Sequence, residues 1–350
     1  MHPSLSPWIQ TGGYVTACLL FLSCGRSGSL PSQDIQLTGS TMGTVWHAKL
    51  PAGPKAVGSE WKPFQAATEH ALAEVDGLMS TYKPASDLSI FNRAPAERWV
   101  PVSPLTLKVT LQALAWAEKT EGAFDPTVMP LVNAWSFGPT DRRTDAPTEK
   151  QLRQIQKLVG YQHIQVRESP PALKKNLGGV ELDFSAIAKG FGVDFASAAL
   201  VKAGAEAFML EVGGELVVQG QKPNRTPWKI EIEQPNDDAS FGSSSQIRVE
   251  LASGQAMATS GDYRNYRVVD GKRISHTIDP RSGRPIEHNL ASVSILAQDC
   301  TTADALATAV MVLGPEKGME LIESLSGVAC LLILRVEEGF EKKPSSNWPS

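Results

Sequence analysis

The sequence predicts an α+β fold in which mixed sheets pack against helices to form one unit. An amphipathic pattern from Trp61 to Ser80 repeats apolar residues every three or four positions, as a helix does. An alternating pattern at Val293, Ile295 and Ala297 is typical of a strand. The 350 residues suffice for a large core, and the sequence shows no internal repeat.

Charge and cysteine content exclude several classes of protein. The formal net charge is −4, so we expect no nucleic-acid partner. Four cysteines are too few for a disulfide scaffold, and the spacing of Cys300 and Cys330 matches no zinc site. We expect two buried thiols in the folded part, with a disulfide between them as the alternative.

The N-terminus has the features of an export signal. An apolar run from Tyr14 to Ser23 is too short to span a bilayer but long enough for the core of a signal peptide. Cys24 follows it and opens a polar linker to residue 35, as at the cleavage site of a bacterial lipoprotein. Phe21 in place of a leucine, and residues 1–23 without Lys or Arg, depart from that pattern. A plain secretory signal or an uncleaved anchor is the alternative.

Helices and short strands are expected to alternate in the first half of the folded part. Asp34 to Leu50 alternates around a Ser-Thr-Met-Gly-Thr loop and predicts two strands. Gly122 ends a helix and opens a sharp turn to Pro126. Tyr82 is the one large side chain in a predicted loop before Lys83-Pro84. The expected helices are 61–80, 105–120 and 149–159, with a loop over 79–93 and a polar connector over 140–147.

A second motif lies in the middle of the chain. Val180 to Phe184 predicts a strand, and a helix is expected to follow almost at once and to end near Lys202. Ser185 is its candidate N-cap, which would direct free backbone N–H groups toward whatever Asp183 faces. Lys189 lies one turn further on. A lysine beside a helix N-terminus can hold a phosphate, although the glycine-rich run of a P-loop is missing.

Strands dominate the last third of the chain. Two strands within 207–220 are expected to pivot on Gly213-Gly214, where the backbone must turn tightly or approach a ligand. Ser260-Gly261 is expected to reach the stretch from Ile274 to Gly314. Further expected strands are 229–232, 247–251 and 329–336, with a mobile loop over 234–245 and a polar, disordered tail over 337–350.

The stretch from Ile274 to Gly314 carries the clearest chemical signal. His276 and Asp279 precede a turn, and the segment after the following strand predicts a helix with Thr302 as N-cap and Gly314 as its end. Asp304 and Thr308 then lie at positions i and i+4 on one helix face. These hard oxygen donors suit Mg²⁺. The alternative is that Asp304 only interacts with the helix dipole and Thr308 has no special role.

These segments together resemble the ApbE family, the FAD:protein FMN transferases. The matching pieces follow the family's order and cover nearly everything between the linker and the tail. They are 40–44, 80–92, 122–128, 182–194, 211–220, 259–266, 275–285 and 304–314. The resemblance implies an ApbE-like fold, related to the tunnelling fold, in which residues 36–336 form one catalytic unit after a signal (1–23) and a linker (24–35).

The family's activity would be a Mg²⁺-dependent transfer of the FMN half of FAD to a Ser or Thr hydroxyl of a target protein, with release of AMP. The resemblance implies that the metal ligands are Asp304, Thr308 and the main-chain carbonyl of Ala186. Some members carry an extra Asp before that threonine. This chain has Ala307 there, which implies that the metal is held more weakly or that a water takes the place of the Asp carboxylate. The implied FAD-contacting residues are Met42, Tyr82, Ala123, Phe124, Asp125, Asp183, Lys189 and Ile278.

Chemical reasoning about phosphoryl transfer agrees with this assignment. The diphosphate charge must be neutralised, and the acceptor hydroxyl must be positioned and lose its proton. His276 is the candidate base, and Asp279 is the rival base or the residue that orients His276. Alternatives are an FAD pyrophosphatase and an FAD-binding lipoprotein without chemistry. The implied partner is an exported redox protein, and the implied location is a bacterial membrane lipoprotein facing the periplasm or the cell exterior.

Overall fold

The structure is a computed structural model that describes residues 34–51, 61–139, 145–233, 246–262, 266–269 and 272–349. The predicted signal segment, Cys24 and the predicted loop 234–245 lie outside the described residues. Within the described ranges, no helix has the length and apolar character needed to cross a bilayer.

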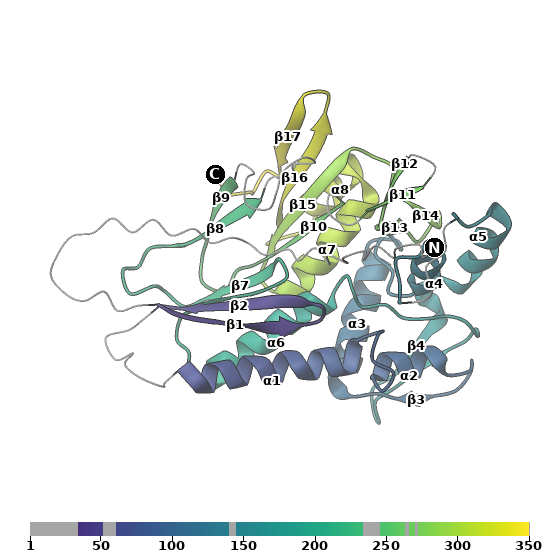
Figure 1. Ribbon diagram of the computed structural model, residues 1–350, viewed down its shortest axis with the longest axis horizontal. Coiled ribbons are helices and arrows are strands. Elements are labelled where there is room, and N and C mark those ends of the chain that lie inside the picture. Colours follow the sequence, from purple (N-terminus) through teal and green to yellow (C-terminus); the bar gives the residue numbers. More distant parts are fainter. Residues whose placement is uncertain are drawn as a thin grey trace, which may run out of the picture.

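An eight-stranded sheet forms the centre of the fold, in the order β1-β2-β6-β7-β10-β15-β16-β17 (Figure 1). Its strands are β1 (Ile35–Thr41), β2 (Thr44–Leu50), β6 (Phe208–Val212), β7 (Glu215–Gln219), β10 (Ala256–Gly261), β15 (Leu290–Ala297), β16 (Ala329–Val336) and β17 (Gly339–Pro344). The α+β class is confirmed. Every neighbouring pair in this sheet is antiparallel, so it is not the mixed sheet expected from the sequence.

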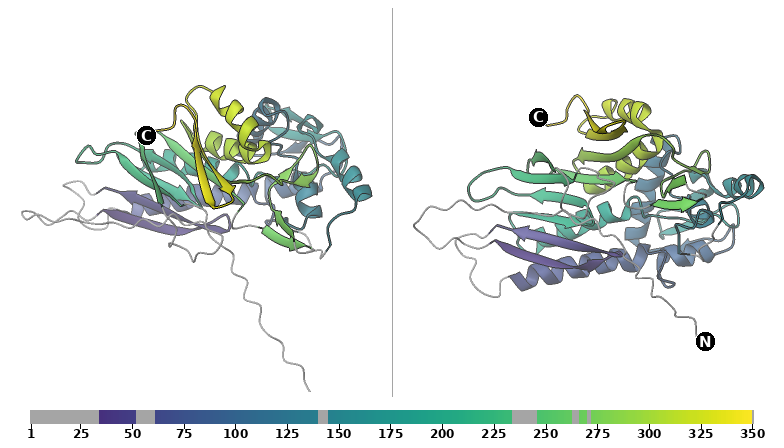
Figure 2. Two further views of the ribbon diagram at one scale, coloured as in Figure 1. Left: turned by 90° about the horizontal axis from the view of Figure 1, so that it is seen from above. Right: turned by 45° about the horizontal axis from the view of Figure 1, so that its top comes forward.

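Three helices cover one face of this sheet: α1 (Lys62–Met79), α6 (Ala188–Lys202) and α7 (Cys300–Leu313). Trp46 and Leu210 from the sheet pack with Leu72 of α1 and Leu200 of α6. Helix α8 (Pro315–Glu323) follows α7 and packs on β16. Figure 2 shows the strands fanning out from β1–β2 to β16–β17 beside these helices.

The opposite face of the sheet is covered by a hairpin of β8 (Trp228–Glu233) and β9 (Gln246–Leu251). Trp228 and Ile230 of this hairpin pack with Leu216 and Leu331 of the sheet. The central strands are therefore buried on both faces, and every residue of β6 and β15 is buried.

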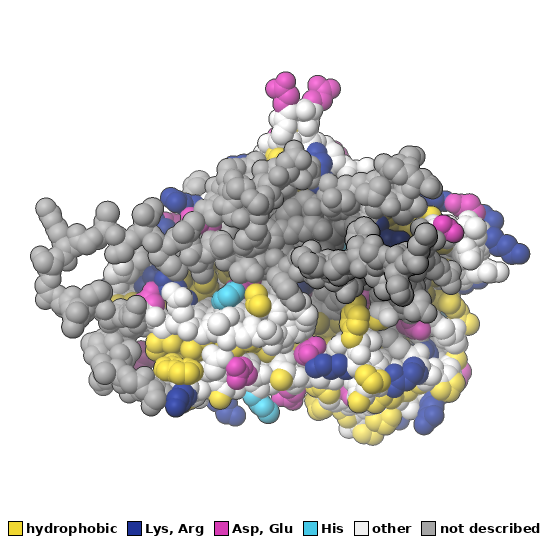
Figure 3. Space-filling view, viewed as in Figure 1, with side chains coloured by type: hydrophobic (Ala, Val, Ile, Leu, Met, Phe, Trp, Pro, Cys, Tyr) yellow, Lys and Arg dark blue, Asp and Glu magenta, His cyan; other side chains and the backbone are white. Residues whose placement is uncertain are grey.

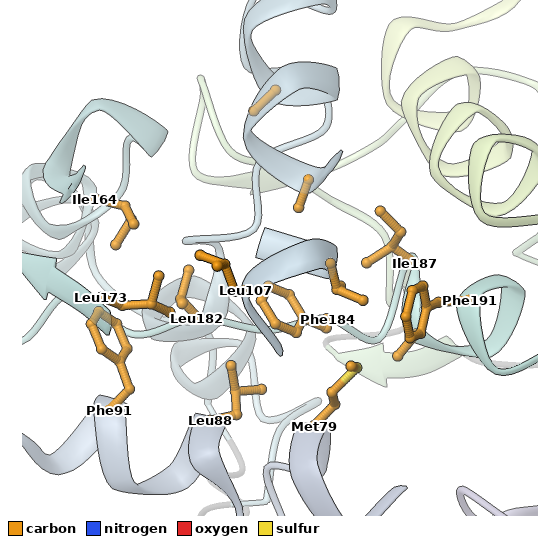
Figure 4. Packing of buried hydrophobic residues seen from close by; sticks show 14 of the residues in the cluster. Met79, Leu88, Phe91, Leu107, Ile164, Leu173, Leu182, Phe184, Ile187 and Phe191 are labelled. Carbon is orange, nitrogen blue, oxygen red and sulfur yellow. The ribbon is translucent and has the colours of Figure 1, made fainter. Parts of the chain in front are cut away.

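A second cluster of buried hydrophobic residues forms a second core (Figure 4). Figure 4 shows Leu182, Phe184 and Ile187 among the side chains of this core, with Leu107 and Phe191 close by. The surrounding elements are α2 (Asp87–Arg93), α3 (Pro104–Lys119), α4 (Met129–Ala134), α5 (Glu149–Ile155), the 3₁₀ turns η2 (Gln156–Leu158) and η3 (Tyr161–His163), and the sheet β3 (Val100–Pro101), β5 (Ala172–Lys175), β4 (Ile164–Arg167).

Two small hairpins carry the loop that contains His276. They are β11 (Tyr266–Val269) with β12 (Lys272–Ser275), and β13 (Ile278–Asp279) with β14 (Arg284–Pro285). Ile278 is buried with Leu131 and Trp135 of the α4 region. The indole N–H of Trp135 also donates to the carbonyl of Gly283 at 2.9 Å, so α4 holds this loop in place.

Two expected local structures are wrong. Part of the expected loop 79–93 is helix α2, because the Ser86 side chain accepts from the N–H of Ser89 and Leu88 and Phe91 are buried. The expected strand Val180–Phe184 is not a strand, and it pairs with none of the strands that the structure describes. The side chain of Asn92 takes that place: it donates to the carbonyl of Leu182 at 2.9 Å and accepts from its N–H at 2.7 Å.

The predicted N-caps of two helices, Ser185 for α6 and Thr302 for α7, are also wrong. Helix α6 begins at Ala188, three residues after Ser185, and the Ser185 hydroxyl donates to Asp183 instead. Helix α7 begins at Cys300, and its N-cap is Asp299, whose side chain accepts from the N–H of Thr302 at 2.7 Å. Gly314 ends α7 as predicted.

The tail expected to be disordered is folded. Gly339 turns the chain with a φ of 87°, and β17 then pairs with β16 along its length. The Ser345 hydroxyl accepts from the N–H of Cys330, and the Asn347 side chain donates to the carbonyl of Val328. Cys300 and Cys330 are both free and buried, which confirms the expectation of two thiols.

The surface charge is mixed in sign. On the face shown in Figure 3, basic and acidic side chains are interspersed over the described part of the surface, with hydrophobic side chains gathered toward its lower edge.

Candidate active site

Helices α6 and α7 approach each other closely at Gly190. The N–H of Gly190 donates to Oδ2 of Asp304 at 2.9 Å. A Cβ at position 190 would lie 2.2 Å from the carbonyl oxygen of Cys300, so only glycine fits. Asp194, one turn further along α6, accepts from the backbone N–H groups of Cys300 and Thr301, both at 2.9 Å. These contacts fix the position of Asp304 relative to α6.

The ammonium group of Lys189 lies between two buried carboxylates. Its Nζ is 3.3 Å from Oε1 of Glu215 and 3.8 Å from Oδ1 of Asp304. The Lys189 side chain is 28% exposed, whereas each carboxylate side chain is 3% exposed, so the lysine is the most accessible side chain of the three. Lys189 and Asp304, predicted from separate motifs, are therefore brought together. Glu215 joins them, although it was not predicted as a site residue.

The buried charges shift each other's titration. Burial opposes the charge of Lys189, but the carboxylates of Asp304 and Glu215 raise its pKa above the ordinary value. Burial raises the pKa of Asp304, with Lys189 and the Gly190 N–H acting in the opposite direction. Burial likewise raises the pKa of Glu215. On the same hairpin, burial raises the pKa of Glu211 to about 7, although a hydrogen bond from Gly214 lowers it.

Several polar atoms around this group have no partner in the described part of the protein. They are Oε2 of Glu215 and the hydroxyl oxygens of Thr41 and Thr44, all buried. The two threonines flank the β1–β2 turn, and a Cβ on Gly213 would lie 2.8 Å from the Thr44 side chain, so the two hairpin ends touch. Buried polar atoms without partners are uncommon in a finished interior, and they are expected where a polar ligand binds.

Met42 and Thr308 border the same region. Met42 sits at the β1–β2 turn with a φ of 45°, and its methyl group would be 2.6 Å from a Cβ on Gly192 of α6. The Thr308 hydroxyl is 3.4 Å from the Ser260 hydroxyl of β10, which confirms that Ser260 reaches the stretch from Ile274 to Gly314. The structure thus places Met42, Lys189, Asp304 and Thr308 around the α6–α7 joint.

The turn at residues 122–126 packs against the segment that leads into α6. The N–H of Asp183 donates to the carbonyl of Pro126 at 2.7 Å. The carboxylate of Asp125 is occupied internally: it accepts from the N–H and hydroxyl of Thr127 and from the N–H of Tyr161. Burial raises the pKa of Asp125, and these bonds oppose the shift. Ala123 and Phe124 are buried too, so their side chains shape the turn from inside.

Asp183 itself has a local role in the structure. Its Oδ1 accepts from the N–H and the hydroxyl of Ser185, at 2.8 and 2.5 Å. Leu182 and Phe184 on either side point into the second core, so Asp183 and Ser185 face away from it. Ala186 is half-buried between this turn and α6.

The loop with His276 lies beside the turn at Gly122. A Cβ on Gly122 would be 3.8 Å from the Arg281 side chain. Both carboxylate oxygens of Asp279 accept from the Arg281 guanidinium, at 2.9 and 3.1 Å. The His276 ring is half-buried and contacts Phe137 edge-on, with 6.4 Å between ring centroids. The Ile278 side chain is buried with Trp135, so only its backbone can meet a ligand.

Tyr82 is the most exposed of the predicted residues, with 71% of its surface accessible. It follows the end of α1, and its N–H donates to the Ser80 hydroxyl. A surface cavity of about 370 Å³ lies elsewhere, beside Gly220, Trp228 and Glu250, and none of the predicted site residues lines it.

Comparison with known proteins places this geometry in context. The family model described as "ApbE family" matches residues 42–332. An FAD:protein FMN transferase of Vibrio cholerae is 39% identical over 334 residues, which cover 95% of this chain and 96% of that protein. One from Haemophilus influenzae is 39% identical over 315 residues, covering 89% and 90%. The solved structure of the flavin transferase ApbE from Vibrio cholerae superposes with a TM-score of 0.80, covering 90% of this chain and 98% of that one at 39% identity.

Proposed function

This chain belongs to the ApbE family, and we propose that it is an FAD:protein FMN transferase whose acceptor is a serine or threonine hydroxyl of an exported redox protein. The observation that carries the proposal is the α6–α7 joint, where Lys189, Asp304 and Thr308 meet beside unpartnered buried oxygens. A cation, a carboxylate and a hydroxyl in one place suit a diphosphate with its metal.

We propose Mg²⁺ as the metal, held by Asp304, Thr308 and the carbonyl of Ala186. Oδ2 of Asp304 accepts from Gly190, so Oδ1 faces the cation side. In a regular helix the Gly190 N–H would donate to the carbonyl of Ala186, but here it donates to Asp304, which supports a free carbonyl. Within the described residues no cluster of three or more His, Cys, Asp or Glu is arranged as a metal site. When bound, the ion would neutralise diphosphate charge.

The position before Thr308 supports this donor set. Ala307 is fully buried in the core between α7 and the sheet. It supplies no oxygen, and water would complete the coordination of the metal, as Mg²⁺ commonly allows.

We propose His276 as the base that receives the proton of the acceptor hydroxyl. The hydroxyl oxygen attacks the phosphorus of the FMN half, the bond from this phosphorus to the AMP oxygen breaks, and a phosphoester remains. Asp279 is less suited to this role, because Arg281 engages both of its carboxylate oxygens. We assign Asp279 instead to shaping the loop that carries His276.

The contacts proposed for FAD divide between side chains and backbone. Lys189, Met42 and the exposed Tyr82 can offer side chains to the ligand. Asp125 and Ile278 would contribute through their backbone, because the Asp125 carboxylate is occupied and the Ile278 side chain is buried. Buried Ala123 and Phe124 would act in the same way, and Asp183 would shape the entry to α6.

The test uses purified protein from residue 25 with FAD, Mg²⁺ and a candidate acceptor protein. Mass spectrometry should find the acceptor heavier by one FMN phosphoester on a Ser or Thr, with AMP released in equal amount. An acceptor with Ala at that position is the control. Free FMN and AMP without modified acceptor would indicate a pyrophosphatase, and unchanged FAD would indicate binding without chemistry.

We also propose that the protein is an exported lipoprotein anchored through Cys24, on the basis of the apolar run before it. Cys24→Ser should move the protein from the membrane fraction to the soluble or unprocessed fraction. Unchanged membrane association would show that Cys24 is not the anchor and that the Tyr14–Ser23 segment remains attached.

A further inference from the structure

Glu215 is a buried side chain at the candidate site whose role neither the family resemblance nor the proposed chemistry explains. It is the first residue of β7, a strand whose next three residues are apolar and buried. Glu215 is 2% exposed, and its Oε2 has no hydrogen-bond partner among the described residues. A buried carboxylate is costly, and a buried ion pair adds little to stability, so a structural role alone is a weak explanation.

The contacts of Lys189 suggest what Glu215 does. Two carboxylates share one ammonium group, which lies closer to Glu215 (3.3 Å) than to Asp304 (3.8 Å). The other oxygen of Asp304 is held by Gly190. Oδ1 of Asp304 is therefore the oxygen left for a metal, and it is also the oxygen that Lys189 would pair with if Glu215 were absent.

We propose that Glu215 is a positioning residue that holds the Lys189 ammonium away from Oδ1 of Asp304 and so keeps this oxygen open to a divalent cation. The inference rests on the proposed metal site. Without Glu215, Lys189 would be an internal competitor of the metal. With it, the ammonium stays beside the metal position, where it can meet an incoming diphosphate.

The test measures metal binding rather than turnover. Mn²⁺ is titrated into the protein without FAD, and bound Mn²⁺ is followed by electron paramagnetic resonance. Glu215→Met keeps the length of the side chain but removes both oxygens, and it should weaken Mn²⁺ binding about tenfold or more, the effect of losing a charged hydrogen bond. Lys189→Met should bind Mn²⁺ at least as tightly as the unmodified chain.

The double variant is decisive. If Glu215 acts through Lys189, adding Glu215→Met to Lys189→Met should change Mn²⁺ affinity by less than about threefold. An equal loss in both backgrounds would mean that Glu215 binds or attracts the metal directly, and would overturn the proposal. So would unchanged binding in Glu215→Met alone.

Controls separate this inference from the metal site and from folding. Glu211→Met changes a second buried glutamate of the same hairpin, one that bonds Gly214, and should leave Mn²⁺ affinity within about threefold. Unchanged Mn²⁺ binding in Asp304→Ala would contradict the metal site itself. If circular dichroism shows that Glu215→Met is unfolded, Glu215→Asp replaces it. Because the aspartate side chain is shorter, Glu215→Asp should lower Mn²⁺ affinity by less, and this loss should disappear when Lys189→Met is added. A loss of Mn²⁺ affinity that persists in the Lys189→Met background would overturn the proposal.

Discussion

The N–H of Gly190 donates to Oδ2 of Asp304 at 2.9 Å, and this bond joins the two helices that carry the candidate site. The bond depends on the missing side chain, because a Cβ at Gly190 would lie 2.8 Å from the Cβ of Asp304. The lysine motif and the aspartate motif are thus parts of a single contact surface.

Gly190→Ala should separate α6 from α7. Overpacking a close contact costs about 1 to 3 kcal/mol, and displacement of Asp304 should lower FMN transfer about 100-fold. The control is Gly77→Ala in α1, where a Cβ meets nothing within 4 Å and should raise stability by up to about 1 kcal/mol. Thermal unfolding and transfer rates measure both effects. Normal FMN transfer by Gly190→Ala would show that the reaction does not need the close contact between α6 and α7.

His276→Asn should separate chemistry from binding. Loss of a general base lowers the rate by about 10²- to 10⁴-fold, while FAD affinity, measured by flavin fluorescence, should stay the same. His70→Asn removes an exposed imidazole of α1 and should have no effect on either quantity. If His276→Asn loses only FAD affinity, the ring contacts the ligand and Asp279 becomes the candidate base.

Asn92→Ala should loosen the approach to α6 without touching the ligand. It leaves the buried N–H and carbonyl of Leu182 unpaired, which should cost about 2 to 4 kcal/mol in the free energy of unfolding. Since Asp183 follows directly, FAD binding should weaken as well. Asn224→Ala, in an exposed turn, should change stability by less than about 0.5 kcal/mol. Denaturant unfolding measures the stability, and FAD titration measures the affinity for FAD. If Asn92→Ala is destabilised but binds FAD normally, Asn92 stabilises the core and does not influence FAD binding.

Glu211 should make stability depend on pH. Burial raises its pKa to about 7 from the ordinary value of 4.5, so the folded chain keeps a proton that the unfolded chain releases. The stabilising effect is complete below pH 4.5 and is lost as the pH rises through 7, by about 3 kcal/mol in total. Gln at position 211 cannot titrate. The difference in the free energy of unfolding between Glu211→Gln and the unmodified chain should therefore grow as the pH rises over this range. If denaturant unfolding shows that this difference in free energy is the same at every pH, the raised pKa of Glu211 is contradicted.

Local patterns predicted the parts of the site that lie within one element. Asp304 and Thr308 share a helix face because of their spacing, and the Gly213-Gly214 pivot and the alternation of β15 are equally local. The exceptions are helix α2 and the starts of α6 and α7. Helix α6 has no side-chain cap. In α2 and α7, the side chains that accept from the first helix N–H groups are Ser86 and Asp299. Those signals were present in the sequence.

Several contacts between distant residues could not be predicted. The Asn92 side chain forms hydrogen bonds with the backbone of Leu182, which is 90 residues away in the sequence. The Asp194 carboxylate accepts from the N–H of Cys300 at the start of α7, 106 residues away. Glu215 looked like a strand residue, because nothing near it in sequence shows that Lys189 packs beneath the sheet. One clue was available: a charged residue at the head of an otherwise apolar strand indicates a buried partner.

The folded C-terminus has a consequence for the behaviour of the chain outside its native state. Strand β17 is the outermost strand of the sheet, and its exposed residues Glu341, Lys342 and Lys343 end in Pro344. Charges and proline discourage another chain from adding to an edge. Behind them lies β16, whose apolar run Leu331–Leu334 would otherwise form the border of the sheet. A short, charged strand therefore shields the apolar strand β16, and a chain that ended at Val336 would expose β16 to self-association.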